Sequence, residues 1–375
     1  MLLCVRVYEY HSIPLYKCRV HYKNTRAIEK LPAWMRRGRP ASTRTFAHPA
    51  DARHAGTLAK NLHLREVLWL NAQSMAERFP KETAKQRTYR AFEALVTGDD
   101  AAIDLAQAAL LIASTAYPDL DMAHYITQLD LLARRVRALL ELPEQEVQPT
   151  LPENIDPLTI LHALNQVLFT EEQFHGNHAD YTNPENSFFN RVLENHTGIP
   201  ITLSLLYMEV GRRVGIQLDG AGLPYHFMVR CRLPERIIYI DTFEGGLFFS
   251  EQECRERIRQ MAEHIAGGRI KFHAQWFAPI THKQLLFRML NNLKQIYLRN
   301  EDYTHALTIC DLMVLLMPQA APERRDRGTI HLQLKHYARA LHDLMVYLEL
   351  APTAKDRVEI QNHIKSIRQI MAMLN

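Results

Sequence analysis

The sequence predicts an α+β protein that is mainly helical and ends in tetratricopeptide helix pairs. Three patterns indicate this fold class. From about Thr88 onward, apolar residues recur at steps of three and four, as they do in amphipathic helices. Around residues 226–241 apolar and polar residues alternate, which indicates a β-hairpin. The last hundred residues repeat at a constant offset of 34, the period of tetratricopeptide units.

The composition is that of an ordinary globular chain. Its 375 residues suffice for two or three domains, and 47% of them are hydrophobic and 23% charged. No stretch approaches the roughly 18 consecutive apolar residues of a membrane span. The opening MLLCVRVYEYHS lacks the continuous apolar segment of a signal peptide. We therefore predict neither a membrane span nor a secretory leader.

The cysteines are few and scattered, without the spacing of a metal site. An odd number of isolated cysteines indicates reduced thiols in a cytoplasmic protein. We accordingly expect no metal and no other cofactor. The five residues are Cys4, Cys18, Cys231, Cys254 and Cys310.

The N-terminal part of the chain is basic, whereas the rest is mildly acidic. Residues 1–60 hold 12 lysines and arginines against 3 acidic residues. The cluster of Arg36, Arg37 and Arg39 beside Trp34 is the one candidate contact with nucleic acid or an acidic surface. The favoured interpretation of residues 1–87 is a basic extension, poorly ordered and without a nucleic-acid role.

Helical periodicity then continues through a first helical segment. Asp119 or Asp121 is placed to cap a helix, and Asp156 with Pro157 is placed to begin another whose leucines point inward. The first helix is expected to bury one apolar face, made of Met122, Tyr125, Leu129, Leu132, Val136 and Leu139.

The segment HGNHADYTNPENS, residues 175–187, contains two histidines three positions apart. His175 and His178 could contribute to a metal site only with further ligands, and no other residue has suitable spacing. We predict a surface loop.

A central helix begins after this loop. Pro200 suits its first turn, and Gly215 ends it. Arg212 and Arg213 lie in the last turn, where cations interact favourably with the helix dipole. The buried face is expected to consist of Leu203, Leu206, Val210 and Val214.

Two alternating segments follow and predict a hairpin that brings His226 and Asp241 together. If residues 233–236 form the turn, Arg232 lies opposite Ile237. His226 and Asp241 are then diagonal neighbours on one face, about 7–8 Å apart between backbones. An imidazole and a carboxylate can meet across that distance.

This order of a helix, a histidine strand and an aspartate strand is that of a cysteine-type triad, but the cysteine is missing. In such enzymes the thiol lies at a helix N-terminus, where its pKa is lowered. That place belongs here to residues 198–202, and no cysteine occurs between Thr197 and Val214. Cys231 is five residues beyond His226 and therefore lies on the opposite face of the strand.

Three interpretations of the pair remain open. Thr202 and Ser204 are hydroxyls near the helix start, but hydroxyls are weak nucleophiles without a strong base and an oxyanion hole. The favoured alternative makes His226 and Asp241 a structural pair. Ligand binding or other chemistry is the third.

The C-terminal repeat aligns two helix pairs. Two repeats are few for a free-standing array, so we expect them to pack on the preceding domain with the helix from Lys355 to Met373 as a cap. The matched positions are Tyr303 with Tyr337, Ala306 with Ala340, Leu307 with Leu341 and Pro318 with Pro352.

The motifs together resemble the SirB-type transglutaminase-like proteins of bacteria, over about residues 95–370. The resemblance rests on NSFFNRVL, TGIPITLSLLYMEVGRRVGI, GLPYHF, YIDTF and the repeat, in that order. It implies a papain-like transglutaminase core, a helix packed on a small antiparallel sheet. It also implies that His226 and Asp241 occupy the histidine and aspartate positions. The thiol position falls near residues 200–202, so the acyl-transfer activity is not carried over.

The chain also departs from the usual sequence pattern of that family at three positions. His196 stands where an arginine is common, and Thr242 where a proline usually follows the aspartate. Tyr225 replaces the glycine that commonly precedes the histidine and could crowd the cleft. We assign to the cleft or its support Asn186, Asn190, Pro200 and Tyr225.

The sequence thus predicts three parts: an extension over 1–87, a transglutaminase-like domain with an N-terminal helical subdomain over 88–275, and a tetratricopeptide domain over 276–375. The favoured function is a non-catalytic cytoplasmic protein that holds a protein or peptide partner in the repeat groove. The alternative is a hydrolase or acyltransferase with a non-cysteine nucleophile, assisted by His226 and Asp241.

Deleting residues 1–60 is expected to leave retention on DNA or RNA columns unchanged across a salt gradient, because the extension is assigned no nucleic-acid role. A deletion that removes salt-dependent retention would instead give these arginines a phosphate-binding function.

Overall fold

The computed structural model describes residues 83–143, 155–224, 226–266 and 272–374. The described residues all belong to one compact unit. The expectations for residues 1–82 of the basic extension and for Tyr225 lie outside the described residues. Within the described part of the chain, no helix is both long enough and apolar enough to cross a membrane.

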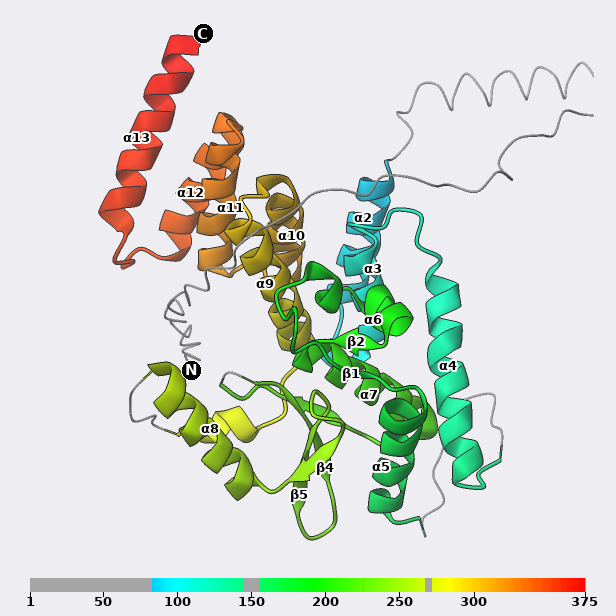
Figure 1. Cartoon of the computed structure of the whole chain (residues 1–375). Helices are drawn as coiled ribbons and strands as arrows, with labels where there is room; N and C mark the ends of the chain where they lie inside the picture. The colour runs from blue at the N-terminus through cyan, green and yellow to red at the C-terminus, as the bar shows by residue number, and fades with distance from the viewer. Residues whose placement is uncertain (1–82, 144–154, 225, 267–271, 375) are drawn as a thin grey trace, which may run out of the picture. The chain divides into compact units, whose positions relative to one another are not determined.

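The described residues are mostly helical, and a small sheet interrupts the helices in mid-chain (Figure 1). The helices are α2 (Ala84–Val96), α3 (Leu105–Ala113), α4 (Met122–Leu139), α5 (Pro157–Asn165), α6 (Phe189–Asn195), α7 (Pro200–Val214), α8 (Glu251–Ala266), α9 (His282–Arg299), α10 (Tyr303–Leu316), α11 (Ala321–Gln333), α12 (Tyr337–Leu350) and α13 (Arg357–Leu374). The short helical turns are η1 (Asp100–Ala102), η2 (Gln166–Glu171), η3 (Pro184–Ser187) and η4 (Ala274–Phe277).

Four antiparallel strands form the sheet in the order β3-β4-β5-β6. Cys231 pairs with Ile238 and Arg232 with Ile237, so the hairpin register predicted from the sequence is confirmed. The alternation pattern indicated only the central hairpin, because the outer strands are three residues long. The strands are β3 (Asp219–Ala221), β4 (Met228–Arg232), β5 (Ile237–Asp241) and β6 (Leu247–Phe249), and a separate parallel pair joins β1 (His175–Gly176) to β2 (Thr197–Gly198).

Helix α7 is the centre of the core. Thirteen of its fifteen residues are buried, rather than the single predicted face. The helix contacts the sheet on one side and α4, α5, α6 and α9 around the rest. A helix enclosed by neighbours on all sides has no polar face to keep. The sequence pattern underestimated its burial for that reason.

The last turn of α7 contains a buried carboxylate that the sequence pattern did not identify. Glu209 has a side chain only 4% exposed, and it accepts hydrogen bonds from Arg212 at 2.9 Å and Arg213 at 2.5 Å. Arg213 also contacts Asp130 of α4 at 2.7 Å. The two arginines thus compensate a buried carboxylate by direct contact. The sequence pattern predicted only their interaction with the helix dipole.

The structure refines three predicted helix details. α2 begins four residues before Thr88, because Thr83 and Gln86 form a capping box at its start. Of the two aspartates expected to cap α4, Asp121 does so. Leu139, expected to be buried, is 51% exposed at the last position of α4.

The repeat period is confirmed by the helices themselves. α10 and α12 begin at Tyr303 and Tyr337 and end at Leu316 and Leu350, an offset of 34 at both ends. α9 and α11 precede them as the first helix of each pair, and α13 follows as the predicted last helix. From α2, Lys85 donates to Thr308 at 3.1 Å and Tyr89 to Asp311 at 3.1 Å. The repeats therefore pack against the preceding helices, as expected.

A buried ion pair joins the two repeats. The ammonium of Lys294 on α9 is 3% exposed and contacts Glu323 at 2.7 Å and Asp326 at 2.8 Å on α11. Burial alone would lower the pKa of Lys294, but the two carboxylates outweigh burial and raise it. Burial also raises the pKa of Glu323. The ammonium, with two acidic partners, is the more firmly charged member of the pair.

Lys294→Met is expected to lower the free energy of unfolding by about 3–5 kcal/mol, because it leaves buried carboxylates without their cation. Chemical denaturation followed by circular dichroism measures the change. The double variant Lys294→Met, Glu323→Leu should recover part of the loss. A single variant as stable as the parent would show that the ion pair does not couple the repeats.

Candidate functional site

His226 and Asp241 meet at one end of the central hairpin. Asp241 is the last residue of β5, and His226 lies two residues before β4. His226 Nε2 is 2.9 Å from Asp241 Oδ2, with the Asp241 side chain fully buried and that of His226 13% exposed. The distance suits an ion pair, but neither atom has a well-aligned hydrogen bond. The predicted proximity is confirmed, whereas the function of the pair remains a prediction.

Asp241 is also part of a turn. Its Oδ1 accepts hydrogen bonds from the backbone N–H of Phe243 at 3.2 Å and of Glu244 at 3.3 Å. The backbone N–H of Gly246 donates to the Asp241 carbonyl at 2.8 Å, and Gly246 has a φ of 82°, which favours glycine. The carboxylate thus organises the connection from β5 to β6 as well as facing His226.

A second side chain contacts the same carboxylate. Arg257 of α8 lies 3.6 Å from Asp241 Oδ2 and also covers the ring of Phe249 at 4.7 Å. The Asp241 carboxylate is therefore shared between the imidazole of His226 and a guanidinium of α8.

The two faces of the sheet have different partners. Phe227, Val229 and Cys231 belong to the main core together with α7, whereas Met228 and Tyr239 cluster with Cys254 and Ile258 of α8. His226 lines a pocket with residues of α8, and Asp241 contacts Arg257 of α8. The pair therefore faces α8.

Little space remains beside the His226 ring. The pocket has a volume of about 10 Å³, and a cavity of roughly 10–15 Å³ holds one water molecule. An acyl substrate needs far more room than this. The lining residues are Leu223, His226, Met228, Cys254, Arg257, Ile258 and Met261.

The hydroxyls at the start of α7 are occupied by structural hydrogen bonds. Thr202 is fully buried; its Oγ1 donates to Asn186 O at 2.8 Å and accepts from the Ile199 N–H at 3.1 Å. Ser204 is equally buried, and its Oγ lies 2.9 Å from Thr242 Oγ1. Neither contact involves the imidazole of His226. This arrangement argues against a nucleophilic role for either hydroxyl.

The asparagines assigned to the cleft or its support are both buried, and Asn186 supports the loop before α7. Asn186 is 4% exposed, donates to Asp180 O at 2.7 Å and accepts from Asn177 at 3.0 Å. Asn190 is 2% exposed, and its Oδ1 has no hydrogen-bond partner. Pro200 is buried at the first position of α7.

Cys254 is the residue that sequence reasoning missed. It lies in the first turns of α8 and lines the same pocket as His226. The apolar spacing of Cys254, Ile258 and Ala262 indicates a helix with one buried face. That pattern does not show which face of the sheet the helix covers. The thiol was accordingly not associated with His226.

The environment of Cys254 keeps its thiol protonated. The side chain is 2% exposed, and its Sγ donates to Met228 Sδ at 3.7 Å. Burial raises the pKa of Cys254 to about 12, although the cation of Arg257 acts in the opposite direction. Because the thiolate is the nucleophile, a thiol with this pKa is inert near neutral pH.

The two loop histidines diverge in the structure. His175 lies in β1, with Nε2 3.3 Å from Thr197 Oγ1, whereas His178 Nε2 is 3.8 Å from Glu244. Across the described ranges of the chain, no three or more histidine, cysteine, aspartate or glutamate side chains are arranged to hold a metal ion.

Comparison with known families agrees with the architecture. A model of the transglutaminase-like superfamily matches residues 123–291, and a tetratricopeptide repeat model matches residues 293–365. The predicted order of a transglutaminase-like segment followed by tetratricopeptide repeats is therefore confirmed.

Relatives are found in bacteria and in animals. A UPF0162 protein of Xylella fastidiosa is 36% identical over 272 residues, which cover 72% of this chain and 92% of that protein. A UPF0162 protein of Vibrio cholerae is 28% identical over 252 residues, 67% of this chain and 87% of that protein. Human F-box only protein 21 is 32% identical over 170 residues, 42% of this chain and 26% of that protein.

In the native protein, Cys254 is expected to resist alkylation by iodoacetamide at pH 7.5, because its pKa of about 12 leaves almost no thiolate. Peptide mass spectrometry after native and denatured labelling measures the modified fraction. Labelling only after denaturation is the expected result. Native labelling faster than that of free cysteine would reveal an activated thiol beside His226.

Proposed function

This chain belongs to the UPF0162 family, and we propose that it is a non-catalytic protein that binds a protein or peptide partner. One observation carries the first half of the proposal. The face of the sheet that bears His226 and Asp241 is covered by α8, which leaves a volume of about 10 Å³ beside the imidazole. This pocket is too small to hold an acyl substrate.

The state of the candidate nucleophiles among the described residues supports the same conclusion. They are two hydroxyls near the start of α7 and the thiol that lines the pocket with His226. Thr202 and Ser204 are buried in hydrogen bonds, and Cys254 is held protonated by burial. General-base catalysis requires the base to reach the proton that it removes. Among the described residues, the His226 side chain forms no hydrogen bond with any of these three groups.

His226 and Asp241 are proposed to be structural. Asp241 accepts two backbone hydrogen bonds and faces the side chains of His226 and Arg257. These contacts connect β5, the segment before β4 and α8. A buried carboxylate with such partners stabilises the local fold, and removing it leaves the partners without compensation.

The repeats supply the binding half of the proposal. Tetratricopeptide arrays commonly present extended surfaces to partner segments, and two such helix pairs follow the transglutaminase-like domain here. Three cysteines in the described residues, Cys231, Cys254 and Cys310, are free and buried. Reduced thiols of this kind support a cytoplasmic location, which we include in the proposal.

The alternative is a hydrolase or acyltransferase in which His226 and Asp241 assist a nucleophile other than the missing cysteine. The domain partition at residues 87 and 275 is likewise a proposal. The two functions differ in what the chain loses when the imidazole is removed.

His226→Ala is expected to lower the melting temperature by roughly 1–2 °C, since the unfolding entropy of a unit of about 300 residues converts a loss of about 1 kcal/mol into a shift of that size. It should change no turnover of glutamine-peptide or ester substrates. Differential scanning calorimetry and a substrate panel provide the measurements, with Glu244→Ala as the control at a neighbouring exposed position. Activity in the parent that disappears in a folded His226→Ala protein would establish the enzymatic alternative.

A further inference from the structure

The two tetratricopeptide units have the same turn between their helices but fill it with different side chains. In the first unit the N–H of Asp302 donates to the Tyr297 carbonyl at 2.9 Å, and in the second the N–H of His336 donates to the His331 carbonyl at 2.8 Å. The residue before each donor has a left-handed φ, 57° in the first turn and 59° in the second. Both pairs of positions are 34 residues apart. The backbone of the turn is thus repeated, so its side chains decide how each turn responds to pH.

A carboxylate closes the first turn. Asp302 accepts a hydrogen bond from the His305 N–H at 3.1 Å and so caps α10. Its other oxygen lies 2.6 Å from His305 Nδ1, so a proton gained by that imidazole meets a carboxylate. Burial raises the pKa of Tyr297 to about 12, and its phenol therefore stays neutral. Acidification brings no like charges together among these side chains.

The second turn holds two imidazoles that face each other. His331 is 4% exposed in the last turn of α11, and its Nδ1 lies 3.3 Å from Nδ1 of the exposed His336. His336 precedes α12, and its side chain forms no capping hydrogen bond. When both rings are neutral, one Nδ1 donates its proton to the other. When both are protonated, both nitrogens are donors and neither can accept. Two cations then face each other at hydrogen-bond distance.

Charged groups on three helices surround the buried imidazole. His331 Nε2 lies 4.0 Å from Asp343 Oδ2 of α12. Arg327 of α11 already contacts Asp343 at 2.7 Å and Asp311 of α10 at 3.1 Å. Burial lowers the pKa of His331, the two aspartates oppose that effect, and Arg327 and His336 add to it. The folded second repeat therefore favours the neutral imidazole. The further cations on these elements are Arg324, 3.4 Å from Asp343, and Lys335 of the turn.

We propose that His331 and His336 form a pH-sensitive switch that loosens the turn between α11 and α12 in mildly acidic solution. The switch goes beyond the binding function, because it concerns when the second repeat is ordered and not what the repeats bind. In an opened turn both rings are in water, where histidine has a pKa of about 6.5. Below that pH the opened turn binds more protons than the closed one. Closure is therefore fully favoured above about pH 6.5 and is lost as the pH falls.

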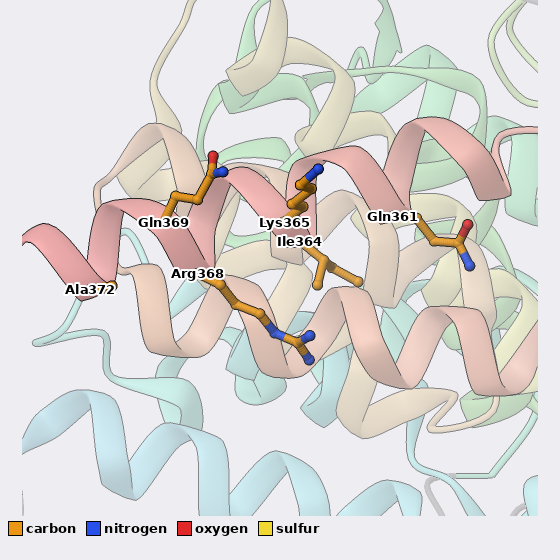
Figure 2. A pocket seen from close by; sticks show the side chains of 6 residues that line it. All are labelled: Gln361, Ile364, Lys365, Arg368, Gln369 and Ala372. Atoms are coloured by element: carbon orange, nitrogen blue, oxygen red, sulfur yellow. The ribbon is translucent and has the colours of Figure 1, made fainter.

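An opened turn would affect α12 and α13 together. Helices α11 and α13 both pack on α12, and Leu344 of α12 shares a hydrophobic cluster with Ile364 of α13. Ile364 and Arg368 point toward the neighbouring helix (Figure 2), and Arg368 lies 3.8 Å from Met345 Sδ of α12. A turn that opens at the start of α12 loosens one of the two surfaces that hold this helix. We expect acidification to leave α9 and α10 in place.

Hydrogen exchange of the full chain, followed by mass spectrometry of its peptides, tests the switch. Protection factors, corrected for the intrinsic pH dependence of exchange, are compared at pH 7.5 and 5.5 for residues 331–343 and 297–309. Protection of the second turn should fall about tenfold at pH 5.5, since one extra proton taken up with a pKa of about 6.5 changes the opening equilibrium by that factor. The first turn should change by less than about twofold.

Three variants separate the pair from its surroundings. His336→Gln removes one of the two charges at an exposed position and should abolish the acid-dependent loss of protection. His336→Asp reproduces the carboxylate of the first turn and should also abolish it, because a protonated His331 then faces an anion. His342→Gln, at another exposed position of α12, is the matched control and should retain the tenfold loss. Thermal melting at pH 7.5 confirms that the variants fold.

Unchanged protection of the second turn at pH 5.5, or an equal loss in both turns, would overturn the proposal. So would a loss that survives in His336→Gln, because the effect would then belong to the burial of His331 alone. Neither partner binding nor turnover enters these measurements. Failure of the switch therefore leaves the proposed binding function as it stands.

Discussion

Strand alternation is the constraint on which the central domain depends. Successive side chains of β4 and β5 point to opposite faces of the sheet, so α7 receives Phe227, Val229 and Ile240 and α8 receives Met228 and Tyr239. His226 is two residues from Met228, and Asp241 is two residues from Tyr239, so both point to the face that α8 covers. Their position under α8 thus follows from the register. The start of α7, where the resemblance places the missing thiol, holds buried Thr202 instead.

Burial then decides what the functional groups beneath α8 can do. A carboxylate in this position must be compensated, and the turn after β5 together with Arg257 provides that compensation for Asp241. A thiol in the same apolar setting loses acidity, as Cys254 shows. The packing that stabilises this face is therefore also the packing that raises the pKa of its thiol.

The repeat domain handles charge differently in its interior and at its end. Inside the repeats, Lys294 and Arg327 bind carboxylates of adjacent helices, which fixes the register between neighbouring helices at the cost of desolvating the charges. Among the described elements, α13 packs its apolar face on α12. The last helix of a repeat array has no following repeat to cover its outer face, which is therefore polar.

The sequence by itself determined the features that depend on local spacing. The repeat period, the register of the hairpin, the proximity of His226 and Asp241 and the start of α7 at Pro200 all follow from steps of two, three to four or 34 residues. Only the tertiary structure decided which helix covers which face of the sheet. It therefore also decided that Cys254 and Arg257 lie beside the pair. Periodicity tells that a helix has a buried face, but it carries no information on the surface that buries it, because that choice depends on contacts between segments distant in the chain.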